Sequence, residues 1–106
     1  MKYGPIVSSV QIFQKLVQQP LPLRKAYQLS VMARKMDEEL VFFRSKYQEI
    51  MESALSDAEK SAKVEELLNF EIEWDLEPLQ LSANDDIRLS ANDIDKAAGL
   101  IEITDL

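Results

Sequence analysis

The longest apolar pattern in the chain lies between residues 26 and 54. Apolar side chains recur there at alternating spacings of three and four, which keeps one stripe of a helix facing a partner helix over four heptads. The stripe consists of Ala26, Leu29, Ala33, Met36, Leu40, Phe43, Tyr47, Ile50 and Ala54. A helix over about 22–55 would be roughly 50 Å long, whereas a compact domain of this size has a radius of gyration of only about 13 Å. The pattern therefore predicts an elongated, oligomeric or docked molecule.

A shorter amphipathic helix is predicted before the long one. It begins at Pro5, which suits the first turn of a helix, and it ends before Pro20. Its apolar positions are Ile6, Val10, Phe13 and Val17. Prolines hold residues 19–22 extended, so the two helices should form an antiparallel hairpin. The short helix reaches along only about 21 Å of its neighbour, which leaves the half around Phe43, Tyr47 and Ile50 uncovered.

A third helix is predicted over 56–69, because Ser56 and Glu59 are spaced as a capping box. Continuation of the long helix through this point is the alternative. From residue 70 to 77 the apolar period changes to two, and the intervening positions are all carboxylates. This alternation is typical of a β-strand, which Pro78 ends or places at a sheet edge. The carboxylates are Glu71, Glu73, Asp75 and Glu77.

The last thirty residues predict short elements. Residues 86–89 could pair with the acidic strand as a second strand. A capping box from Ser90 to Asp93 opens a short helix that ends before Gly99, and residues 100–103 form a third strand or a docking segment. The pentapeptide Leu-Ser-Ala-Asn-Asp occurs at 81–85 and again at 89–93, which indicates two similar turns.

Together these elements predict an α+β fold that is mainly α. One domain covers 1–106, with the helical hairpin in 1–55, the third helix in 56–69 and an acidic, β-containing part in 70–106. The sheet is expected to be small and antiparallel. With the C-terminal helix it should cover the far end of the long helix.

Charge and composition then exclude several functions. The net charge is −7, divided as +3 over residues 1–55 and −10 over 56–106. This distribution lacks the basic footprint of nucleic-acid binding, and it favours packing between the halves, between subunits or with a basic partner. Cys and His are both absent, which removes thiolate zinc sites and the commonest general base. We therefore expect no enzyme activity and no cofactor.

Metal and membrane sites are not expected either. The aspartates at 85, 86, 93 and 95 lack the register of a calcium-binding loop. No apolar run approaches the ~20 residues that span a bilayer, and the first residues lack the pattern of a signal peptide. The expected location is therefore cytoplasmic.

Two surfaces are candidate binding sites for a protein partner or for a second copy of the chain. The first is the uncovered part of the stripe, at Phe43, Tyr47 and Ile50, although aromatic side chains at this spacing, Phe42, Phe43 and Tyr47, more often form core than a binding site. The second is the acidic strand with its carboxylates at 71, 73, 75 and 77. Those carboxylates could form a solvated face that protects a sheet edge, a landing surface for basic side chains, or a mimic of nucleic-acid phosphates.

One family resemblance accompanies these patterns. Glu66-Leu67-Leu68-Asn69 leads into the acidic alternating segment, and Leu89-Ser90 with Asp93 precedes the last helix. This order of elements resembles a group of small proteins from tailed phages and prophages that is catalogued as a domain of unknown function. The resemblance brings no activity and no catalytic residues. It implies a virion or assembly component, or an early protein directed at a host machine.

The expected function is therefore non-catalytic protein–protein binding by a phage-type protein, as a virion, assembly or oligomeric accessory component. The alternative is an acidic inhibitor that occludes a basic site on a host defence or nucleic-acid-processing protein. Either protein would work in the cytoplasm of the host cell or in the virion.

Overall fold

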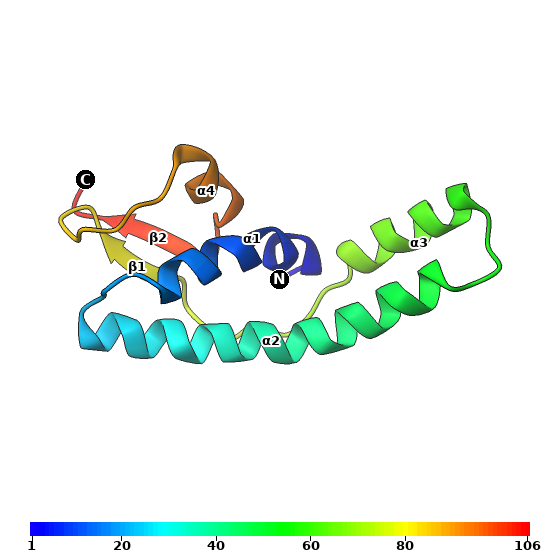
Figure 1. Ribbon diagram of the computed structural model, residues 1–106, viewed down its shortest axis with the longest axis horizontal. Helices are drawn as coiled ribbons and strands as arrows, with labels where there is room; N and C mark the ends of the chain where they lie inside the picture. Colours follow the sequence, from blue (N-terminus) through cyan, green and yellow to red (C-terminus); the bar gives the residue numbers. More distant parts are fainter.

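The computed structural model describes residues 1–106, and it places four helices beside a two-stranded sheet. The elements are α1 (Tyr3–Val17), α2 (Leu23–Met51), α3 (Asp57–Leu68), β1 (Leu79–Ser82), α4 (Ala91–Lys96) and β2 (Ile101–Thr104). The molecule measures 51 × 24 × 22 Å, and α2 runs along most of its length (Figure 1). The predictions of a mainly α, α+β fold and of an elongated shape are confirmed.

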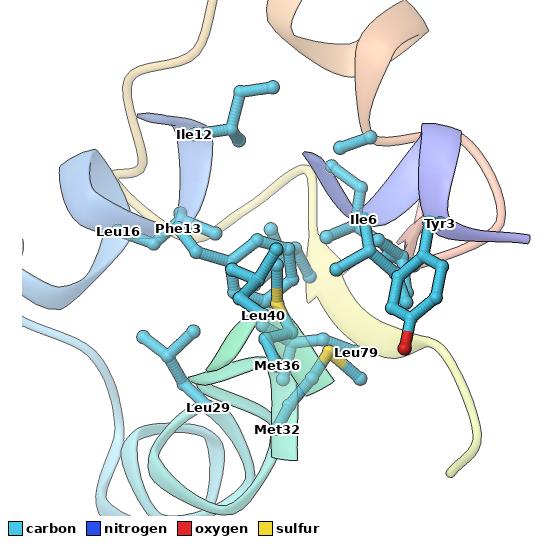
Figure 2. Packing of buried hydrophobic residues seen from close by; sticks show 14 of the residues in the cluster. Tyr3, Ile6, Ile12, Phe13, Leu16, Leu29, Met32, Met36, Leu40 and Leu79 are labelled. Atoms are coloured by element: carbon cyan, nitrogen blue, oxygen red, sulfur yellow. The ribbon is translucent and has the colours of Figure 1, made fainter. Parts of the chain in front are cut away.

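Helices α1 and α2 form the predicted antiparallel hairpin, and their facing sides make most of the core. From α1 the buried apolar residues are Tyr3, Ile6, Ile12, Phe13 and Leu16; from α2 they are Leu29, Met32, Met36, Leu40 and Phe43 (Figure 2). Within its buried part, α2 departs from the predicted stripe at Ala26 and Ala33, which are only partly buried, and at Met32, which is buried although it lies off the stripe. Burial stops after Phe43, because α1 begins beside that residue and extends toward the start of α2.

The sheet is parallel, so the prediction of an antiparallel sheet is wrong. The register runs in the same direction on both strands, from Leu79 paired with Ile101 to Ser82 paired with Thr104. The chain between them contains α4. Parallel neighbours need a crossover connection of this kind, whereas a hairpin would have needed only a tight turn.

Residues 70–77 do not form a strand, which corrects the second part of the sheet prediction. We call this segment the acidic strap. It makes one antiparallel bridge, between Lys2 and Glu71, and the N–H of Ile72 donates to the carbonyl of Met1 at 2.8 Å. Beyond that point, residues 73–77 make no backbone hydrogen bond within the protein. Alternate residues of the strap are partly buried against the core: Ile72, Trp74 and Leu76. The period of two therefore reports an extended chain lying on the core.

Residues 86–89 are not a strand either. This segment pairs with a side chain instead of a neighbouring strand, because the amide of Gln19 both donates to the carbonyl of Arg88 at 3.1 Å and accepts from its N–H at 2.8 Å. The prediction of a strand at the C-terminus is confirmed as β2.

The far end of α2 is covered by α3, whereas the sheet lies near the start of α2 (Figure 1). The prediction that the sheet would cover the far end is therefore wrong. Helix α3 begins where Ser56 predicts, and the Ser56 hydroxyl accepts a hydrogen bond from the N–H of Glu59 at 3.2 Å. That cap satisfies a backbone donor at a helix start, which favours a new helix over continuation of α2.

The repeated pentapeptide forms two similar turns, and each is held to a helix by a lysine. Asp85 and Asp93 each accept a hydrogen bond from the N–H of the serine three residues earlier. Asp85 also pairs with Lys25 of α2, and Asp93 pairs with Lys15 of α1 at 3.0 Å. The second turn completes the predicted capping box of α4. The repeat thus has a structural role, because it fixes the C-terminal part against the hairpin.

We expect the Asp93 contacts to stabilise the protein at neutral pH and to lose their effect in acid. The hydrogen bond from Lys15, followed by that from the Ser90 N–H, holds the pKa of Asp93 below its usual range. A carboxyl whose pKa is depressed by folding contributes stability above its unfolded pKa, and the contribution is lost as the pH falls through the folded pKa. The unfolding free energies of wild type and Asp93→Asn, measured with urea from pH 7 to about pH 2, should therefore differ at neutral pH and converge in acid. Asp95→Asn, an exposed change on the same helix, should show no such trend.

Candidate protein-binding groove

The end of α2 and the whole of α3 form a two-helix arm, which we define as residues 42–70. The turn between the helices is fixed by local hydrogen bonds. The Lys60 ammonium donates to the carbonyl of Met51 at 3.0 Å, and the Ser53 hydroxyl donates to that of Ile50 at 2.6 Å. A cation at a helix C-terminus also complements the helix dipole. Helix α3 itself has no fully buried residue. The arm is therefore a single layer of two helices, without the second layer that would cover their apolar faces in a four-helix bundle.

A groove of about 440 Å³ runs between the two helices of the arm. Its residues are Phe42, Lys46, Glu49, Ile50, Ser53, Leu55, Lys63, Glu66, Leu67 and Phe70. On α2 they follow one helix face, as do those on α3, because both sets recur at spacings of three and four. The apolar residues are flanked by two lysines and two glutamates. Lys46 lies 3.3 Å from Glu49, and Lys63 lies 3.9 Å from Glu66.

An aromatic cluster closes the inner end of the groove. At its centre is Tyr3, which is only 2% exposed, and its ring lies 5.3 Å from Phe43, 6.3 Å from Phe70 and 6.4 Å from Phe42 between centroids. Phe42 and Phe70 are themselves 47% and 55% exposed. The Lys46 ammonium lies 5.7 Å from the centre of the Phe42 ring, a cation–π distance. Phe42 and Phe70 therefore cover the Tyr3 ring, while about half of each phenylalanine side chain remains exposed to solvent.

The Tyr3 hydroxyl is held in a defined state. It donates to the Glu39 carboxylate at 3.4 Å. Burial, together with the negative charge of Glu39 and this hydrogen bond, raises the pKa of Tyr3 above its usual value. The Tyr3 phenol is therefore protonated and uncharged at neutral pH, where it has a structural role.

The structure brings only one of the three predicted stripe residues to the groove. Ile50 lines it, whereas Phe43 belongs to the core and Tyr47, stacked on Phe43 at 6.2 Å, is exposed outside the groove. The sequence alone does not single out Phe70 as a binding residue. Phe42 lies off the apolar stripe, a position that indicates a second contact face of α2, and its ring stacks on Tyr3 at the start of α1.

The predicted acidic site lies on the strap, and its carboxylates all point to solvent. Glu71 pairs with the N-terminal amine of Met1 at 3.0 Å. Glu73, Asp75 and Glu77 are exposed and make no ion pair. Phe70 joins this surface to the groove, because it begins the strap and also lines the groove.

The groove offers binding chemistry: an apolar floor, two exposed aromatic rings and a rim of both charges. Neither in the groove nor in the rest of the protein does a group of three or more acidic side chains lie close enough together to hold a metal ion. None of the four helices combines the length and the apolar character that crossing a membrane requires.

Comparisons of the chain with protein-family models, with curated proteins and with solved structures find no match. The resemblance to small tailed-phage proteins therefore stays a prediction.

Proposed function

We propose that the protein acts by binding another protein chain in the groove of its arm, without a catalytic step of its own. The observation that carries this proposal is the exposure of Phe42 and Phe70, about half each, beside an apolar groove. Buried apolar surface is worth roughly 25 cal/mol per Å², so leaving two aromatic rings in water forgoes stabilisation that a partner would supply. Aromatic residues are also enriched at protein–protein interfaces, where they serve as anchors.

The shape of the groove suits a helical partner. Two helices already form one layer of a bundle, and a partner helix or helix pair would add the second layer. Its apolar residues would enter between α2 and α3, as in other helix-in-groove complexes. Lys46, Glu49, Lys63 and Glu66 would surround them as the polar rim that such interfaces have.

The family resemblance supplies the biological setting of this proposal. A small phage-type protein with a binding arm would serve as a virion, assembly or oligomeric accessory component. It would work in the host cytoplasm or in the virion.

The acidic strap supports a second candidate function, that of an inhibitor. Glu73, Asp75 and Glu77 repeat every second residue on extended chain, and none of them makes an ion pair. Carboxylates about 6.6 Å apart repel one another, so basic side chains of a partner would relieve that repulsion. The strap would then occlude a basic site on a host defence or nucleic-acid-processing protein.

Photo-crosslinking from single positions tests both candidates. A photoreactive amino acid at Ser53, inside the groove, is expected to give one dominant protein adduct in the cells that make the protein. The matched position is Ser45, which is exposed on α2 but lies outside the groove, and it should give only background. Equal labelling from both positions would contradict the proposal.

The same experiment includes the strap. The inhibitor candidate predicts an adduct from position 77 with a basic protein. That adduct should disappear at about 0.5 M salt, because the screening length then falls to roughly 4 Å. An adduct from Ser53 should persist, because salt hardly weakens apolar packing. A salt-resistant adduct from position 77 would contradict the inhibitor candidate.

A further inference from the structure

We propose that the groove is occupied by the same groove of a second copy of this chain, packed antiparallel about a two-fold axis. The inference rests on the proposed function, since it names the partner for the arm. The two arms together would form a four-helix bundle, in which α2 packs on α2 and α3 on α3.

The α2 side of the groove matches its own reverse. Phe42, Lys46 and Glu49 of α2 and Ser53, just after its end, have spacings of four, three and four, which read the same in both directions. Ile50 also lines this side, and its counterpart in the reversed pattern is Ser45, outside the groove. An antiparallel two-fold pairing therefore places Lys46 opposite Glu49 of the second copy, and Glu49 opposite its Lys46. It also places Phe42 opposite Ser53 of the second copy, so a large exposed ring meets a small residue.

The charges of the rim favour a second copy over other partners. The groove is lined by two lysines and two glutamates, so its rim is neutral although the chain carries −7. A strongly basic partner would meet Lys46 and Lys63, and a strongly acidic one would meet Glu49 and Glu66. A second copy in the antiparallel arrangement meets the opposite charge at both α2 positions, and unlike charges across an interface select the partner and its register.

The geometry of the molecule permits this pairing. The two copies overlap only at their arms. An antiparallel arrangement places the rest of each copy at opposite ends of the dimer, which keeps the negative charges of the two copies apart. Two helices about 10 Å wide over the ~16 Å from residue 42 to 53 cover roughly 320 Å² per copy. Stable interfaces bury about 800 Å² per partner. We therefore expect a reversible dimer with a micromolar Kd and a length of about 85 Å, given monomers of 51 Å that overlap by ~16 Å.

Sedimentation of the full chain at concentrations from about 1 to 300 μM tests the dimer. Lys46→Glu and Glu49→Lys should each weaken self-association about tenfold, because each puts two pairs of like charges in contact across the axis. An equimolar mixture of the two variants should restore association, because the two glutamates of Lys46→Glu then face the two lysines of Glu49→Lys. The double variant K46E/E49K should also associate as wild type does.

The control is Glu38→Lys, which changes the net charge as Glu49→Lys does but lies outside the groove, and it should self-associate like wild type. A wild-type chain that stays monomeric at 300 μM would overturn the inference. So would a dimer that ignores both single variants, or a mixture that fails to associate.

Crosslinking separates this inference from the proposed function. With the photoreactive residue at Ser53, the second-copy arrangement predicts an adduct of twice the chain mass. An adduct with a different protein would overturn the second copy while supporting the proposed function. Background labelling alone would overturn both.

Discussion

Leu16→Ala is expected to lower the free energy of unfolding by about 2–5 kcal/mol, whereas Val17→Ala should change it by less than about 0.5 kcal/mol. The two positions are consecutive in α1 but face opposite surroundings. Leu16 is 0% exposed, between Phe13 of its own helix and the core face of α2, while Val17 is 56% exposed. Removing the Leu16 side chain loses its burial and also leaves a cavity that the two helices cannot fill without moving apart.

Urea unfolding measures the difference. A chain of this length has a total unfolding free energy of about 5–15 kcal/mol, so Leu16→Ala should move the urea midpoint by a large fraction of its value without changing the slope. Similar losses at both positions would mean that α1 does not present Leu16 to the core. A changed slope would mean that the variant alters the compactness of one of the two states.

The helices were predictable because their signals are local. Pro22, Ser56 and Ser90 precede the first residues of α2, α3 and α4, while α1 begins at Tyr3, two residues before the predicted start at Pro5. Capping and proline geometry act over three or four residues, so they survive in almost any tertiary context.

The sheet was not predictable in the same way, because strand pairing is decided by distant residues. The alternation over 70–77 is as regular as a strand requires, yet those residues lie on the core without a neighbour beyond Glu71. A period of two shows that the chain is extended with one side covered, and it does not show whether another strand lies beside it. Strand β1 carries only Leu79 and Leu81 as buried alternating residues, and four residues are too few for a pattern to stand out.

The groove was partly predictable. The apolar stripe of α2 is longer than α1, which correctly indicates an uncovered end, and Ile50 lies there. The stripe could not show that Tyr3 would bury Phe43 and leave Phe42 and Phe70 in water. That outcome depends on where α1 begins relative to α2, a tertiary relation that no local spacing encodes.

Tyr3→Ala is expected to cost about 3–5 kcal/mol of unfolding free energy, whereas Tyr3→Phe should cost less than about 1 kcal/mol. The ring of Tyr3 contacts rings from α2 and from the strap, so truncating it removes the centre of the aromatic cluster. The hydroxyl contributes less, because its bond to Glu39 is long at 3.4 Å and Glu39 keeps its ion pair with Lys35. Urea unfolding of both variants measures the two costs.

The Tyr3→Phe variant also isolates the ionisation of the phenol. Because folding raises the pKa of Tyr3, its contribution to stability is complete below the ordinary value of about 10 and is lost as the pH rises through the folded pKa. Wild type should therefore lose more stability than Tyr3→Phe as the pH rises above about 10. Parallel curves would mean that the phenol is free to ionise in the folded protein.

The effect of Tyr3→Ala should be strongest in the arm. Helix α3 has no fully buried residue, so its amides should exchange with solvent through local opening at a lower free energy than those of α1. Phe70 lies two residues after the end of α3 and stacks on Tyr3, so loss of the Tyr3 ring should make local opening of α3 easier still. Hydrogen exchange should then accelerate more in α3 than in the centre of α1. Uniform acceleration would instead mean that the arm and the hairpin unfold as one cooperative unit, and that the groove is as rigid as the core behind it.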